Sequence, residues 1–88
     1  MMGGIWLDFP SVWDLVLKNA GQTFYTGTGL PFTYQVQDDV VRTSRTNYRL
    51  TKRDFEKAFE RMPLSGPGPL NDIVRGPSYV FAILNKLL

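Results

Sequence analysis

The sequence predicts an α+β fold in which a small antiparallel sheet packs against three helices. Apolar and polar residues alternate over residues 32–36, as in a strand with one buried face. Apolar residues recur with the helical period over residues 55–62. Because the predicted strands follow one another and the helices are separate from them in the chain, the sheet should be antiparallel. With 88 residues, we expect a single domain over 1–88.

Pro10 and Ser11, followed by Asp14, predict the start of the first helix, since a serine side chain can accept a free backbone N–H at that position. Gly21 can adopt the left-handed conformation that ends helices. The first helix is therefore expected over residues 11–20.

A β-hairpin is predicted over residues 32–46. Its first strand is the alternating segment 32–36, and its second is the β-branched run 40–46. Asp38 and Asp39 form the polar break between the two strands. Before the hairpin, residues 22–26 are expected to be extended and residues 27–31 to form a turn.

Thr51 and Asp54 predict the start of a second helix, because their spacing matches a capping box. An apolar stripe follows at helical spacing, and Pro63 ends the helix because the residue before a proline leaves the helical region. The second helix is expected over residues 52–62.

Gly76 and Pro77 predict the start of a third helix over residues 77–87, since proline is favoured in a first turn. This helix has almost no polar face. It is therefore either buried on all sides or covered by a partner. Because so short a chain has difficulty surrounding one helix, a homodimer that buries residues 79–88 is one of the two expected outcomes.

Composition excludes several function classes. The chain has no cysteine and no histidine, which removes disulfides, thiolate or imidazole catalysis and the usual zinc ligands. We therefore expect a non-enzymatic protein with no metal and no cofactor; the alternative is an enzyme that uses oxygen ligands or tyrosine. The longest apolar run is shorter than the roughly 20 residues of a membrane span, and the start resembles no signal peptide. A cytoplasmic protein without a membrane partner is expected.

Positive charge is concentrated in one segment. Residues 42–61 hold seven basic and three acidic residues, net +4, whereas residues 1–41 hold one basic and four acidic residues, net −3. Arginine forks suit phosphate oxygens, so a basic hairpin edge and helix start could follow a nucleic-acid backbone. The candidate nucleic-acid-binding residues are Arg42, Arg45, Arg49, Lys52 and Arg53. The alternative is a solvated face or a charged edge strand that resists aggregation.

A second candidate site is the start of the third helix, where Arg75, Ser78 and Tyr79 could bind an anion. The alternative is that Gly76 and Ser78 only set the entry of the helix while Arg75 pairs with Asp72.

A different function class uses apolar surfaces. Trp6, Phe9 and Trp13 cluster near the N-terminus and either form a contact surface or belong to the core. With the apolar third helix, they could make a protein-interaction or small-ligand-binding module. In that case the arginines would only keep the protein soluble.

Three segments share a resemblance: residues 32–36, the Arg-Thr-Ser-Arg-Thr run that begins at Arg42, and residues 75–84. They resemble short bacterial proteins of unknown function that are carried on mobile gene cassettes, over about residues 22–85. The resemblance implies a bacterial cytoplasmic protein. It implies no activity, cofactor or site.

Overall fold

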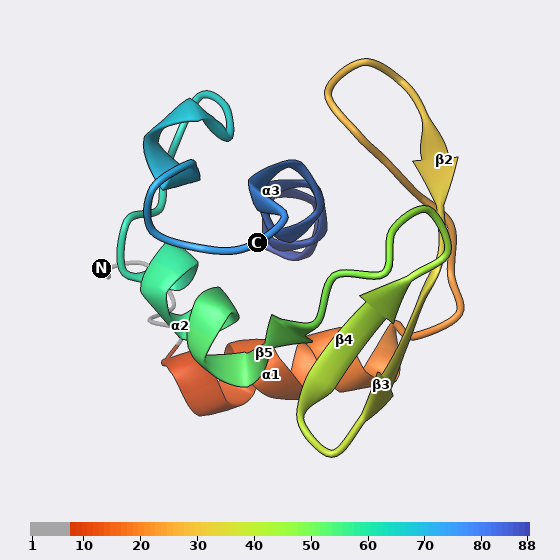
Figure 1. The fold of residues 1–88 in the computed structure, drawn as a ribbon. Helices are drawn as coiled ribbons and strands as arrows, with labels where there is room; N and C mark the ends of the chain where they lie inside the picture. Colours follow the sequence, from red (N-terminus) through yellow and green to blue (C-terminus); the bar gives the residue numbers. More distant parts are fainter. Residues whose placement is uncertain (1–7) are drawn as a thin grey trace.

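The computed structural model describes residues 8–88 and confirms the predicted α+β fold, with three α-helices and two small antiparallel sheets (Figure 1). The elements in chain order are α1 (Phe9–Lys18), β1 (Phe24–Tyr25), β2 (Pro31–Phe32), β3 (Tyr34–Gln37), β4 (Val40–Thr43), β5 (Leu50–Thr51), α2 (Lys52–Phe59), the 3₁₀ helix η1 (Gly68–Leu70) and α3 (Pro77–Leu87). β1 pairs with β2, and β3, β4 and β5 form the second sheet in that order.

The predicted cap of the first helix is wrong. The carboxylate of Asp8 accepts the backbone N–H of Ser11 at 3.1 Å, so Ser11 lies inside α1. Asp8 is favoured because Pro10 then lies in the first turn, where it needs no N–H partner. The helix also ends earlier than predicted, at Lys18. Gly21 is left-handed, with φ of 89°, but its N–H already donates to the Tyr34 carbonyl of β3.

The predicted hairpin is confirmed around its turn, where Asp38 and Asp39 both have positive φ, 53° and 60°. Positive φ at both central residues is the geometry of the type I′ turn that matches the twist of paired strands. The predicted first strand is split at Thr33: Phe32 pairs with Phe24 of β1, whereas Tyr34 pairs with Thr43 of β4.

The second strand of the hairpin ends at Thr43 instead of residue 46. Beyond it the chain turns away and returns as β5, a two-residue strand that the sequence analysis missed. Val41 of β4 pairs with Leu50 of β5, and both are fully buried. The β5 strand therefore adds a third row to the core face of the hairpin.

The capping box of α2 is confirmed. The Thr51 hydroxyl accepts the N–H of Asp54, and the Asp54 carboxylate accepts the N–H of Thr51 at 3.0 Å. Because Thr51 also ends β5, the strand runs directly into the helix. The helix ends at Phe59, before the predicted 62, since Arg61 and Met62 donate to carbonyls three residues back in a tighter turn.

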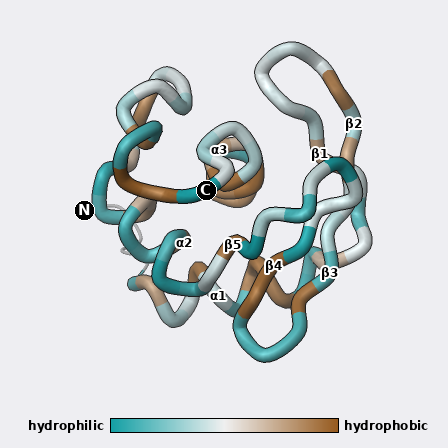
Figure 2. Tube along the Cα trace, viewed as in Figure 1, coloured by the Kyte–Doolittle hydropathy of each residue, from teal (hydrophilic) through white to brown (hydrophobic). Residues whose placement is uncertain are grey.

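α3 has the predicted bounds and passes through the middle of the molecule, in contact with α1, α2 and β1 (Figure 1). Val80, Ile83 and Leu84 are fully buried. Figure 2 shows the hydrophobic part of α3 at the centre and hydrophilic residues at the β3–β4 turn. The chain itself thus surrounds most of α3, so the reason for expecting a homodimer no longer holds. The homodimer stays a prediction.

The N-terminal aromatic residues that the structure describes belong to the core. The Trp13 ring is 4% exposed and lies edge-on to Phe55, with centroids 5.7 Å apart. Phe9 is half-buried and packs on Trp13 and Phe59. Trp6, the third member of the predicted cluster, lies outside the described residues.

Candidate nucleic-acid interface

Strand register brings two of the predicted arginines together. Val41 of β4 pairs with Leu50 of β5, and Arg42 and Arg49 are the residues that follow and precede this last pair. Both side chains are exposed and lie on the sheet face that is turned away from the core. They line one hollow of about 220 Å³ together with Gln37, Asp38 and Val40.

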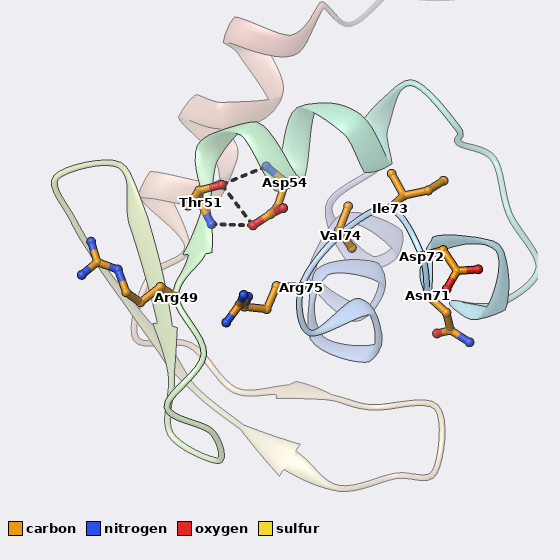
Figure 3. A pocket seen from close by; sticks show the side chains of 8 residues that line it. All are labelled: Arg49, Thr51, Asp54, Asn71, Asp72, Ile73, Val74 and Arg75. Carbon is orange, nitrogen blue, oxygen red and sulfur yellow. Dashed lines mark hydrogen bonds between the residues drawn. The ribbon is translucent and has the colours of Figure 1, made fainter.

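Arg49 also lines a larger cleft of about 650 Å³, and there it is joined by Arg75 (Figure 3). One wall of this cleft is the end of β5 and the start of α2, and the other is the loop between η1 and α3. The remaining lining residues are Thr51, Asp54, Asn71, Asp72, Ile73 and Val74. Arg49 is therefore shared by two neighbouring hollows.

Two aspartates line the cleft without neutralising the arginines. The Asp54 carboxylate accepts both the N–H and the hydroxyl of Thr51, each at 3.0 Å, within the cap of α2. In Figure 3 the side chain of Asp72 extends away from that of Arg75. The one ion pair within residues 8–88 joins Arg53 to Glu56, with nitrogen and oxygen 2.8 Å apart.

The other three candidate nucleic-acid-binding residues have local partners. Arg45 donates from Nε to the Pro31 carbonyl at 2.6 Å. The Lys52 ammonium lies 5.8 Å from the centre of the Trp13 ring, and Arg53 forms the ion pair described above. The basic segment thus splits into the pair Arg42 and Arg49 and three cations that each interact elsewhere.

The predicted anion site at the start of α3 is not gathered into one hollow. Arg75 lines the cleft, but Ser78 and Tyr79 are not among its lining residues. The Tyr79 ring packs edge-on against Phe32, with centroids 5.1 Å apart, and so contributes to the core. Within the described chain Arg75 forms no ion pair with Asp72, which was the alternative interpretation.

Sequence reasoning missed that Arg49 and Arg75 line the same cleft, although the Arg49 side chain extends away from Arg75 in Figure 3. The usable signal was the alternation of Arg49, Leu50 and Thr51, in which one buried residue lies between two polar ones. That pattern indicates a short strand and, by pairing with residues 40–41, would have placed Arg49 beside Arg42. No local pattern connects either residue to Arg75.

Within residues 8–88, no three His, Cys, Asp or Glu side chains gather in a group that could hold a metal ion. No helix in the same part of the chain is long and apolar enough to cross a membrane.

Comparison with known protein families, with curated proteins and with solved structures finds no significant match. The resemblance to cassette-borne bacterial proteins therefore stays a prediction, and the site is interpreted from its geometry.

Proposed function

We propose that this protein is a non-enzymatic binding module that holds the phosphate backbone of a nucleic acid. The backbone lies along Arg42, Arg49 and Arg75, which we call the arginine strip. The observation that supports this most is that Arg49 lines both hollows, one with Arg42 and the other with Arg75. The three arginines therefore line two adjoining hollows.

The chemistry of the strip fits phosphate. Guanidinium groups bind phosphate oxygens through two parallel N–H donors, and arginine remains protonated at any physiological pH. The strip therefore supplies binding but neither a nucleophile nor a general base. Arg42 and Arg49 line the same small hollow, where like charges repel, and an anion between them would relieve that repulsion.

An extended polyanion fits better than a single small anion. The two hollows adjoin through Arg49, so a ligand with successive phosphates can fill both, whereas one phosphate can occupy only one. Asp38 lines the smaller hollow and Asp72 lines the larger one. Because these carboxylates repel phosphate, a phosphate in either hollow should lie close to the arginines.

Only two of the five candidate nucleic-acid-binding residues, Arg42 and Arg49, belong to the proposed site. Arg45, Lys52 and Arg53 have partners within the chain and are expected to contribute little to binding. The alternative module, which would use α3 and the N-terminal aromatics, is not favoured by a specific observation. Most of the apolar surface it requires, including Trp13 and Ile83, is buried in the core.

The test is binding to mixed-sequence DNA and RNA fragments at about 50 mM salt, with two variants of equal charge. Arg42→Ala/Arg49→Ala/Arg75→Ala removes the strip. Lys18→Ala/Arg53→Ala/Arg61→Ala removes three exposed cations elsewhere. Both change the formal net charge from +2 to −1.

We expect the first variant to bind at least about tenfold more weakly than the wild type. The control should keep most of the affinity. Equal losses in the two variants would show that net charge, and not the strip, accounts for binding, and no binding by the wild type would refute the proposal.

A further inference from the structure

Tyr48 is an exposed aromatic residue next to Arg49 in the chain, although it lines neither hollow of the arginine strip. It is 49% exposed and immediately precedes Arg49. A Cβ atom added to Gly76 would lie 3.4 Å from Cδ2 of Tyr48, so the ring lies against the start of α3 next to Arg75. Arg49 follows Tyr48 in the chain, and Arg75 precedes Gly76, the glycine that the Tyr48 ring approaches.

One edge of the Tyr48 ring approaches the protein. Leu50 and Tyr48 both approach Gly76, and Gly76 is buried with φ of 57°. The hydroxyl-bearing half of an aromatic ring that is held in this way can remain in water while its inner edge contacts the protein. Such a ring loses little conformational freedom when a ligand stacks on it.

From this arrangement we infer that the strip takes single-stranded nucleic acid, with a base stacked on Tyr48 and the flanking phosphates on Arg49 and Arg75. The inference rests on the proposed function, and it names the form of nucleic acid. Aromatic side chains combined with basic groups are the general means of holding a single strand without reading its sequence.

A duplex offers the strip phosphates but offers Tyr48 nothing to stack on, because the faces of its bases are covered by their neighbours. A single strand can turn a base outward onto the ring. The exposed ring thus predicts a preference that the arginines alone would not produce, since guanidinium groups bind the phosphates of either form.

The experiment measures fluorescence anisotropy of three labelled probes: a mixed-sequence single-stranded DNA of 12 nucleotides, its duplex, and an abasic strand of the same length. The abasic strand has the same phosphates but no bases. The variants are Tyr48→Leu, Tyr48→Phe and Tyr25→Leu. Tyr25 is a matched control because it is 59% exposed and lies on β1, far along the chain from all three arginines of the strip.

The wild type should bind the single strand at least about fivefold more tightly than the abasic strand, the gain expected from one stacked base. It should also bind the single strand more tightly than the duplex. Tyr48→Leu should lose the preference over the abasic strand, whereas Tyr48→Phe and Tyr25→Leu should keep it. The probe comparison needs no variant, so it can refute base stacking even if Tyr48→Leu does not fold.

Equal affinity of the wild type for the normal and abasic strands would overturn the stacking inference, and so would an unchanged preference in folded Tyr48→Leu. In either case, salt-sensitive binding that depends on the arginines would leave the proposed function standing. Absence of binding to all three probes would overturn both.

Discussion

The two faces of the β3–β4–β5 sheet differ in what they do for the molecule. On the inner face, Tyr34, Val41 and Leu50 are each at most 1% exposed and form part of the core. On the outer face, Arg42 and Arg49 are exposed and meet no oppositely charged partner within residues 8–88. The same strand register therefore produces a face that stabilises the fold and a face where like charges lie side by side.

The outer face is therefore not optimised for stability. Exposed cations beside each other contribute nothing to folding and repel, most strongly at low salt. A sequence can retain such a pair when a ligand uses it. Mutations on the two faces should therefore act on different properties, and five predictions test this separation.

The largest effect is expected on the inner face. Leu50→Ala should lower the free energy of unfolding by about 2–5 kcal/mol, because it leaves a cavity beneath the sheet where Leu50 is fully buried. Urea denaturation measures the change. Arg42→Ala, one row away on the outer face, should change stability by no more than about 0.5 kcal/mol. Similar losses in the two variants would contradict the division between faces.

Gly76→Ala should lower the free energy of unfolding by roughly 2–3 kcal/mol. The position has φ of 57°, which L-residues adopt at a cost, and the added Cβ would lie 2.8 Å from Cδ2 of Leu50. Gly27→Ala is the control, since a Cβ there meets nothing within 4 Å. Thermal or urea denaturation should show a large loss only at Gly76, and a neutral Gly76→Ala would mean that the start of α3 does not fix Leu50.

Tyr34→Phe should lower the free energy of unfolding by about 1–2 kcal/mol. The Tyr34 hydroxyl donates to the Val16 carbonyl at 2.6 Å, near the C-terminal end of α1, and the variant leaves this carbonyl without that donor. Urea denaturation at neutral pH measures the loss. An unchanged midpoint would show that the link between α1 and the sheet contributes nothing.

Alkaline pH should reduce the difference between Tyr34→Phe and the wild type. Burial raises the pKa of Tyr34, so the folded protein keeps this phenol proton at pH values where the unfolded chain has lost it. The contribution of Tyr34 to stability is therefore complete below its unfolded pKa of about 10 and is lost as pH rises above it. Denaturation at pH 9 and pH 11 should show the two proteins converging, and a constant difference would be the contrary result.

The smallest effect has the opposite sign. Arg49→Gln should raise the free energy of unfolding by about 0.2–1 kcal/mol at low salt, because it removes the repulsion with Arg42 in their shared hollow. High salt should abolish the gain. The same variant should weaken nucleic-acid binding. A loss of stability on this substitution would show that Arg49 supports the fold instead of a ligand.

The features that the sequence predicted correctly are encoded within a few residues. The Thr51 and Asp54 cap needs a spacing of three residues, and the Asp38–Asp39 turn needs two adjacent residues. The start of α3 needs only Gly76 and Pro77. Local chemistry decides these features, so the rest of the chain does not alter them.

The features that were missed depend on competition between two possible helix caps or on contacts between residues far apart in the chain. Asp8 and Ser11 both suit a helix start, and Asp8 caps α1 because Pro10 then falls in the first turn. Residues 32–36 alternate without interruption, yet the chain passes from one sheet to the other at Thr33. Nothing in the alternation marks that change of partner.

The sequence predicted that the candidate site would be basic, but it did not predict which residues would form it. Charge counting identified the basic segment 42–61, and the strand register then selected Arg42 and Arg49 from it. Arg75 joins them only because the loop before α3 lies across the cleft from β5. Such a contact is tertiary and has no signature in the sequence around either arginine.

The slope of log affinity against log salt concentration measures directly whether Arg42, Arg49 and Arg75 hold the phosphates. Each phosphate contact contributes about 0.7 to 0.9 to this slope, so removing Arg42, Arg49 and Arg75 together should lower its magnitude by about 2 to 3. The charge-matched variant at Lys18, Arg53 and Arg61 should keep the wild-type slope. Equal slopes for the wild type and the strip variant would show that other residues make the phosphate contacts, which would contradict the proposed role of the arginine strip.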